Sequence, residues 1–225
     1  MDHNQDKALL QLFNKKQFLL ENPNDVVWDI LSREEHQTIL NSVSDFRART
    51  YTPLKTLHTF IQQALSSDKS SNNAVAGVNV GRLISEKRPV CPNSGSYVKA
   101  KKRLKEHTIY ELVKSVGCSS LKKVLSSWKV AGREVKVFDG TTLTLQDTKA
   151  NTEQYPKHSN KNGAVGYPQM RLLAVFSLIT GSIVDYALDA TKGKGTGEVT
   201  LLRSILGCIN EGDIAIGDAL FCNFF

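Results

Sequence analysis

The chain has 225 residues, of which 40% are hydrophobic and 23% are charged, so it can form one large domain or two small ones and bury a hydrophobic core. Lys and Arg outnumber Asp and Glu by 29 to 22, and the net charge of +7 favours polyanionic partners, nucleic acid first. The longest apolar run, at 172–179, is far too short to span a bilayer, which excludes a transmembrane helix built on it.

The cysteines and the N-terminal segment indicate the cellular compartment. The four cysteines, Cys91, Cys118, Cys208 and Cys222, have neither the close spacing of a metal knuckle nor that of a redox pair. They are therefore expected to be free thiols in a reducing cytoplasm. The N-terminal segment is too polar for a secretory signal. Together these features predict a cytoplasmic protein with no membrane association.

The first half of the chain has the periodicity of helices. Ser32 and Glu35 have the spacing of a capping box, and Thr52 followed by Pro53 fits an N-cap and the first helical position. Further helices are expected at 71–85, within 94–117 and from 119 to 128. The sequence therefore predicts a helical region over 1–128.

The pattern changes near 131–132, where β-branched residues begin to alternate. Strands are expected over 134–145, with Asp139 at the end of the first strand. Further strands are expected over 169–180 and 182–190, followed by a helix over 197–209 and a last strand over 212–221. The first strands form an antiparallel meander. The last connection crosses over a helix, so the final strand can lie parallel to the first. The order strand-strand-strand-helix-strand after a helical region predicts an α+β fold.

Two aspartates stand at corresponding places in this scheme. Asp139 ends the first strand and Asp218 ends the last, and neighbouring strands are only about 5 Å apart. Two carboxylates that close repel each other unless a cation lies between them, and hard oxygen ligands suit Mg²⁺ or Mn²⁺. The alternative that both aspartates are turn residues also fits the pattern, because Asp beside Gly is a common turn dipeptide. Asp147 and Asp213 are interpreted as turn residues.

Three blocks of the sequence resemble the IS4-type DDE transposases of bacterial insertion sequences. They are "VFDGTTLTLQDTKAN", "GYPQMRLLAVFSLITGSIVDYALDATKGKGTGEVTLLRSIL" and "GDIAIGDALF". The resemblance is close over 130–225 and looser before it. It implies an RNase H-like catalytic core over 129–225, with the fourth strand parallel to the first. It also implies that Asp139 and Asp218 are the first two catalytic acids and ligands of Mg²⁺ or Mn²⁺.

The resemblance implies DNA transposition as the function. Such a protein binds the inverted repeats of its element, cleaves a phosphodiester, joins the freed 3′-hydroxyl to target DNA, and associates with itself in a synaptic complex near the bacterial nucleoid. The third acid is a glutamate on a later helix, expected beyond Phe225, and Glu198 lies on the wrong element to replace it. The chain is thus expected to be truncated and inactive alone. The alternatives are a non-catalytic DNA-binding or inhibitory fragment and a decayed remnant.

Two basic stretches are candidate DNA contacts. One is the helical segment around 99–105, and the other is the polar loop over 151–168. Their candidate residues are Lys99, Lys101, Lys102, Arg103, Lys105, Lys157 and Lys161. Phosphate contacts by such residues add affinity without reading sequence. A solvated helix face explains the first stretch equally well.

Overall fold

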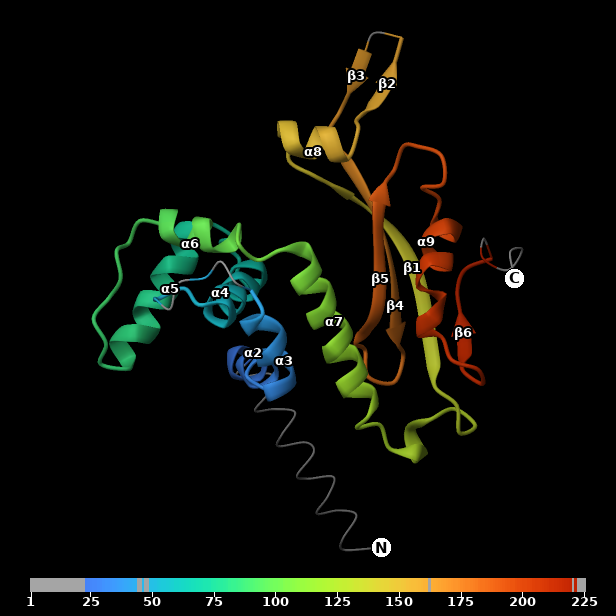
Figure 1. The fold of residues 1–225 in the computed structure, drawn as a ribbon, viewed down its shortest axis with the longest axis horizontal. Coiled ribbons are helices and arrows are strands. Elements are labelled where there is room, and N and C mark those ends of the chain that lie inside the picture. The colour runs from blue at the N-terminus through green and yellow to red at the C-terminus, as the bar shows by residue number, and fades with distance from the viewer. Residues whose placement is uncertain (1–22, 44–45, 47–48, 162, 220, 222–225) are drawn as a thin grey trace, which may run out of the picture. The chain divides into compact units, whose positions relative to one another are not determined.

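The computed structural model describes residues 23–43, 46, 49–161, 163–219 and 221. The chain has a mixed α+β structure and divides into two compact units, Met1–Leu112 and Val113–Phe225. The sequence predicts a boundary at 128/129 because alternation begins there. The contacts instead divide the chain within helix α7 (Glu106–Leu121), whose last turns pack against a strand of the second unit. Figure 1 shows the elements of both units.

The first unit is helical in its described part, as the periodicity predicts. Its apolar residues converge on a core formed by Leu31, Leu40, Leu57 and Leu112. The helices are α2 (Pro23–Leu31), α3 (Glu34–Asn41), α4 (Pro53–Leu65), α5 (Ser71–Ile84), α6 (Gly95–Lys101) and the beginning of α7. None of the helices in the described ranges of either unit is long and apolar enough to cross a membrane.

One of the two predicted helix caps is confirmed and the other is wrong. Thr52 caps α4, because its Oγ1 accepts a hydrogen bond from the backbone N–H of Lys55 at 3.3 Å. Helix α3 instead begins after Arg33, with no side-chain cap. The hydroxyl of Ser32 donates back to the carbonyl oxygen of Asp29, so Ser32 closes the end of α2 rather than the start of α3.

The second unit contains a mixed four-stranded sheet. Strands β1 (Val135–Thr144), β4 (Gln169–Ser177) and β5 (Ile183–Ala190) form an antiparallel meander, and β6 (Ile214–Ile216) pairs parallel to β1. The order across the sheet is β5-β4-β1-β6. The predicted meander and the parallel last strand are both confirmed.

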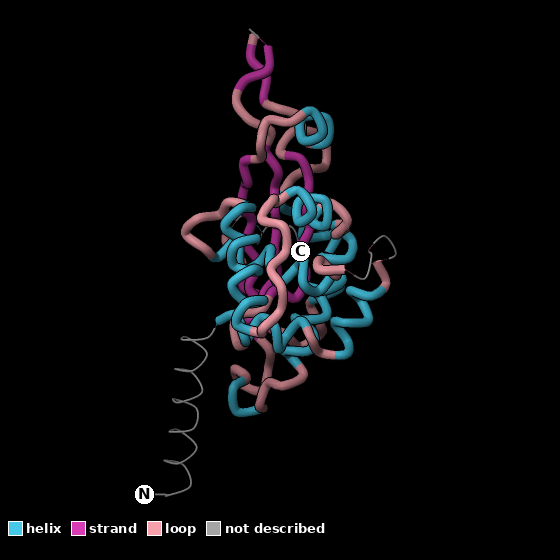
Figure 2. Tube along the Cα trace, turned by 90° about the vertical axis from the view of Figure 1, so that its left-hand side faces the viewer, coloured by secondary structure: helices cyan, strands magenta, loops and turns pink. Residues whose placement is uncertain are grey.

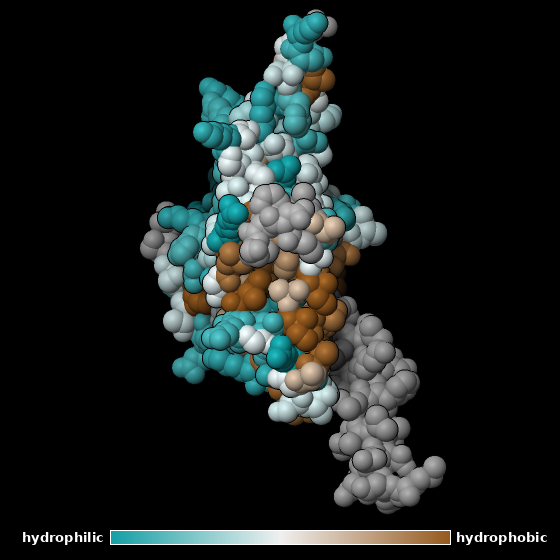
Figure 3. Space-filling view, turned by 90° about the vertical axis from the view of Figure 1, so that its right-hand side faces the viewer, coloured by the Kyte–Doolittle hydropathy of each residue, from teal (hydrophilic) through white to brown (hydrophobic). Residues whose placement is uncertain are grey.

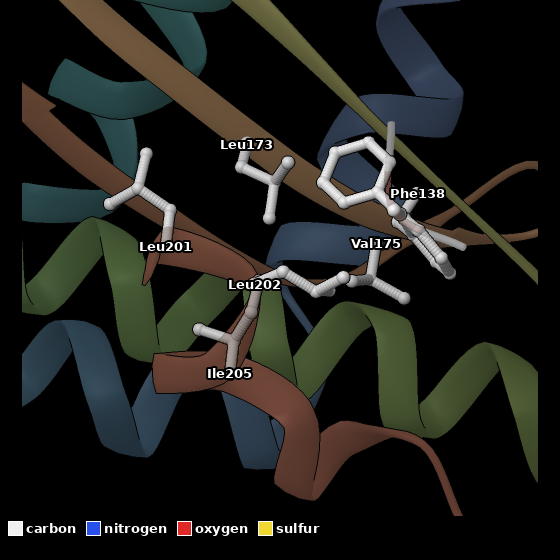
Figure 4. Packing of buried hydrophobic residues seen from close by; sticks show 7 residues of the cluster. Phe138, Leu173, Val175, Leu201, Leu202 and Ile205 are labelled. Atoms are coloured by element: carbon white, nitrogen blue, oxygen red, sulfur yellow. The ribbon is translucent and has the colours of Figure 1, made fainter. Parts of the chain in front are cut away.

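Helix α9 (Glu198–Ile205) provides the crossover and covers one face of this sheet. Its Leu201, Leu202 and Ile205 pack against Leu173 and Val175 of β4, and Figure 4 shows how their side chains interdigitate with Phe138 of β1. Only a short 3₁₀ turn, η2 (Leu206–Cys208), separates α9 from the loop that leads to β6. This packing holds β6 close to β1.

The segment between β1 and β4 is more ordered than the sequence predicts. The predicted polar loop contains helix α8 (Lys149–Gln154) and a hairpin of β2 (His158–Asn160) and β3 (Gly163–Val165). Thr148 caps α8, and Gly163 adopts a φ of +112° beside the hairpin turn, a conformation that favours glycine. The hairpin projects away from the four-stranded sheet in two perpendicular views (Figures 1 and 2).

The helix predicted from 119 to 128 is not a separate element. Helix α7 continues without a break to Leu121, and only a single 3₁₀ turn, η1 (Ser126–Trp128), follows it. Ser119 and Ser120, the first residues of the predicted helix, lie within the last turn of α7. Their hydroxyls instead donate to the carbonyl oxygen of Val116, one turn back inside α7. Both hydroxyls therefore form hydrogen bonds with the C-terminal part of α7 and do not start a new helix.

Candidate functional site

Asp139 lies in the middle of β1 and not at the end of a strand as predicted, although the predicted range of 134–145 agrees with β1. The ladder with β4 runs past it, pairing Asp139 with Ala174 and continuing to Thr144. The threonines after Gly140 keep the strand extended because β-branched side chains favour it. The carboxylate of Asp139 is exposed, and its Oδ1 accepts a hydrogen bond from the N–H of Gly140 at 2.8 Å.

The parallel pairing of β1 with β6 brings Asp218 into line with Asp139. The paired residues are Val135 with Ile214, Lys136 with Ala215, and Val137 with Ile216. Carrying this register two residues beyond Val137 and Ile216 reaches Asp139 on one side and Asp218 on the other. Asp218 is exposed and follows the last paired residue of β6 by two positions.

Asp139 lies on the sheet face that α9 does not cover. Phe138 points into the α9 core, and successive side chains of a strand point to opposite faces, so Asp139 points away from α9. An ideal Cβ at Gly217 would lie 2.1 Å from the Phe138 ring, which puts position 217 on the α9 side. Asp218 follows β6, which ends at Ile216, and its carbonyl oxygen accepts a hydrogen bond from the N–H of Phe221.

A buried ion pair supports the pairing of β1 with β6. Lys136 of β1 is only 1% exposed, and its ammonium group donates to Asp213 Oδ2 at 2.6 Å and to the carbonyl oxygen of Cys208 at 2.6 Å. The N–H of Asn210 donates to the same Asp213 oxygen. Asp213 thus sits in a turn, as predicted, and also carries an ionic role that the sequence interpretation missed.

Glu198, the first residue of α9, lies above Gly140 on the other face of the sheet. An ideal Cβ at Gly140 would lie 2.6 Å from its carboxyl carbon, so glycine leaves room for this side chain. Its Oε1 forms an ion pair with Nε of Arg171 at 3.7 Å, and Nη1 of Arg171 donates a hydrogen bond to the carbonyl oxygen of Thr196 at 2.6 Å. Glu198 is engaged with Arg171 on the face that Asp139 points away from.

The two aligned carboxylates fit a divalent cation by ligand type but do not complete a site. Exposed carboxylate oxygens are ligands that Mg²⁺ and Mn²⁺ accept. Among the described residues, no group of three or more His, Cys, Asp or Glu side chains is placed to hold a metal ion. Asp139 and Asp218 therefore supply at most part of a coordination shell.

An apolar pocket of ≈ 420 Å³ adjoins the end of β6. Its lining includes Phe138, Ile209, Ile216, Asp218 and Phe221. The rings of Phe138 and Phe221 meet edge to face with centroids 5.0 Å apart. Apolar side chains gather on this side of the second unit (Figure 3). Asp218 therefore lies at the border between an apolar surface and solvent.

The basic residues predicted to contact DNA in the first unit do not act as one group. Lys101 turns inward: its ammonium group donates to Gln63 at 3.2 Å and lies 4.8 Å from the centroid of the Tyr97 ring. Burial lowers the pKa of Lys101. Lys102 and Lys105 are exposed. Lys101 thus contributes to the packing around Gln63 and Tyr97.

Lys99 and Arg103 line a pocket of ≈ 410 Å³ together with Arg49. Lys99 and Arg49 are exposed, and Arg103 is partly buried with its guanidinium carbon 5.9 Å from the centroid of the Phe46 ring. The sequence interpretation did not include Arg49. It lies about fifty residues before the basic helix in the sequence, and no local pattern connects it to that helix.

The two basic residues of the segment between β1 and β4 differ in their surroundings. Lys157 donates to Asp147 Oδ2 at 2.6 Å, and this hydrogen bond is the largest cause that lowers the pKa of Asp147. Lys161 is exposed beside the turn of the β2–β3 hairpin. Of the two, Lys161 is the one presented to solvent.

A comparison of the chain with protein-family models, curated proteins and solved structures gives no match in any of the three.

Proposed function

We propose that the second unit is part of an RNase H-like core of the DDE transposase type, which acts on DNA phosphodiesters with Asp139 and Asp218 as ligands of Mg²⁺ or Mn²⁺. The observation that carries this proposal is the register of β1 and β6. Extended by two residues, this register aligns two exposed aspartates that are far apart in the sequence, Asp139 within β1 and Asp218 just after β6. A turn role does not explain the position of Asp139 inside a strand.

The chemistry that a divalent cation supplies in such a site is activation of an attacking oxygen and stabilisation of the leaving one. The contribution of this chain is to hold the candidate ligands in position. The ladder with β4 fixes Asp139, and the Lys136–Asp213 pair fixes the start of β6. The exposed carboxylate of Asp139 makes no ion pair with a described residue, so it can approach a cation without first breaking one.

Iron-mediated cleavage of the polypeptide tests the cation site directly. Fe²⁺ occupies Mg²⁺ sites, and with ascorbate and peroxide it cuts the backbone near the bound metal. Cuts are expected near 139 and 218, with Mg²⁺ competing for them. Asp139→Asn and Asp218→Asn should each abolish both sets of cuts. Glu211→Gln, which changes an exposed acid close to β6, is the matched control and should leave them intact.

Two results would contradict the proposal. Cuts scattered over the surface and insensitive to both aspartate substitutions would show that the pair holds no cation. Cuts at 139 that survive Asp218→Asn would show that the two carboxylates do not share a site. In either case Asp139 and Asp218 would not form a shared cation site.

A non-catalytic DNA-binding function is the second candidate. It is favoured by the absence of a three-ligand cluster among the described residues and by the basic pocket of the first unit. DNA binding that persists with no Mg²⁺-dependent nicking, together with no iron-mediated cuts, would select this candidate over the catalytic one.

A further inference from the structure

The basic pocket of the first unit is built by two segments that are distant in the sequence. Helix α6 supplies Ser96, Lys99 and Arg103, the last of these just after the helix ends, and the segment before α4 supplies Arg49 and Thr50. Ser96 and Lys99 are three residues apart and lie on one face of α6, and Arg103 lies in the turn that follows the helix. Lys101 lies between them in sequence but turns toward Gln63, so the fold itself selects which cations reach the pocket.

The electrostatics of this pocket favour an anion. Three cationic side chains and the hydroxyls of Ser96 and Thr50 line it, and none of its described lining residues is acidic. Cations gathered in a concave site repel one another and raise the local potential. An anion that enters the pocket relieves this repulsion. Guanidinium groups are especially suited to phosphate, because their planar fork donates two parallel hydrogen bonds.

We propose that this pocket receives backbone phosphates of duplex DNA, and that Arg49 forms the contact together with Lys99 and Arg103. The identification of DNA as the partner rests on the proposed function, because a catalytic core that acts on DNA requires the DNA to be bound. The chemistry of the pocket does not depend on the aspartate pair. Contacts of this kind position a duplex without reading its bases, so the binding is independent of sequence.

The salt dependence of DNA binding tests this assignment. Affinity for a short labelled duplex of arbitrary sequence is measured at several salt concentrations for the whole chain and for Lys99→Gln/Arg103→Gln. Each lost phosphate contact should reduce the slope of log affinity against log salt by about 1, so the double variant should lose about 2. Adding Arg49→Gln should remove about one more.

A charge-matched control separates the pocket from general electrostatics. Lys69→Gln/Lys87→Gln removes the same charge from two exposed lysines of the first unit that do not line the pocket. This control should leave the slope unchanged. Equal losses in the pocket variant and in the control would overturn the proposal.

A second readout uses the unmodified protein and so cannot fail through misfolding. Cys91 lines the pocket, whereas Cys118 is an exposed thiol of α7 that does not. Bound duplex should slow alkylation of Cys91 several-fold while Cys118 reacts as before, as read by mass spectrometry of the two peptides. Equal protection of both thiols, or protection of neither, would contradict the proposal.

The same experiments show which of the two proposals fails. Loss of DNA affinity in the pocket variant with iron-mediated cuts retained supports the pocket, whatever the fate of the metal pair. Protection of Cys91 by inorganic phosphate, in a protein that binds no duplex, would keep an anion site but overturn its assignment to DNA. Loss of cuts in Asp139→Asn with unchanged DNA affinity supports the metal pair alone.

Discussion

Lys136 carries its ammonium group into the interior of the second unit, where Asp213 and the carbonyl oxygen of Cys208 receive it. Burial of a charge is costly unless it is paired and hydrogen-bonded, and here both conditions are met. The intact pair therefore adds little to the free energy of unfolding. Loss of one partner lowers this free energy strongly, because the other charge is then buried without a partner.

Lys136→Met should lower the free energy of unfolding by about 3–5 kcal/mol, because it leaves the Asp213 carboxylate buried without its partner. The double variant Lys136→Met/Asp213→Leu should recover most of this loss. Urea denaturation of each variant measures both effects. Lys129→Met removes the more exposed pair with Glu134 and should cost less than about 1 kcal/mol. A double variant no more stable than the single one would contradict this account.

Asp147 provides a prediction about pH. Its hydrogen bond from Lys157 lowers its pKa below the ordinary value of 3.8. A group whose pKa is lower in the folded state stabilises that state above its unfolded pKa and loses the contribution as pH falls through the folded value. The contact should thus be intact at neutral pH and weaken only below about pH 4. Carboxyl NMR titration should show the pKa of Asp147 rising toward normal in Lys157→Gln.

Among the helices, the two predicted caps differ in what they contribute. Thr52→Ala should lower the free energy of unfolding by about 1 kcal/mol, because it removes the hydrogen bond to the N–H of Lys55. Ser32→Ala should change it by no more than about 0.5 kcal/mol, because Ser32 does not cap α3. Thermal or urea unfolding of the two variants checks this difference, and equal losses would contradict it.

The two edges of the sheet also differ. The β5 edge is approached by α7, where an ideal Cβ at Gly117 would lie 2.2 Å from the carbonyl oxygen of Ile183. At the opposite end of the sheet is β6, where Ile216 is 44% exposed. A hydrophobic edge strand of this kind is a site of unwanted strand pairing.

Ile216→Lys should therefore reduce concentration-dependent aggregation, because a charge on an open edge opposes pairing with another chain. Static light scattering over a concentration series measures the effect. Ile183→Lys, at a similarly exposed isoleucine on the covered edge, is the control and should have little effect. Equal improvement from both substitutions would show that net charge, not edge protection, controls aggregation.

Strand order was predictable from the sequence because its determinants are local. Alternating β-branched residues and the glycine turn at Gly181 indicate the meander, and a helix between two strands requires a crossover. The predicted range of 134–145 agrees with β1, Val135–Thr144, but the prediction that the strand ends at Asp139 is wrong. Asp139–Gly140 has the composition of a turn, and the β-branched threonines after it are the local signal that the strand continues.

The candidate sites were predictable to a similar extent. The two aspartates were found because strand order alone aligns them. The role of Lys136 was missed because a lysine in an alternating strand ordinarily indicates a solvent-facing position, whereas this one is buried against Asp213. Lys99 and Arg103 lie on one side of the basic segment and Lys101 lies on another. This difference depends on the residues that pack against α6, and the sequence alone does not reveal them.

At the scale of the whole molecule, the excess of positive charge affects how the aspartate variants behave. Asp139→Asn and Asp218→Asn each make the chain one unit more positive than its net charge of +7. Their affinity for duplex DNA without Mg²⁺ should therefore be equal to that of the unmodified chain or slightly higher. A fluorescence-anisotropy titration checks this. Weaker binding by either variant would indicate damage to the fold rather than loss of a metal ligand.

The position of β6 beside β1 has a consequence for the order of folding during synthesis. The meander β1-β4-β5 can form as soon as it leaves the ribosome, since its strands are consecutive neighbours in the sheet, apart from the inserted hairpin. The β1–β6 pairing joins residues much further apart and carries a larger loop-closure cost. The carboxylate pair therefore comes together last. A nascent chain stalled before β6 would present a folded sheet with only Asp139 in place, so a growing polypeptide acquires both acids only when this strand has docked.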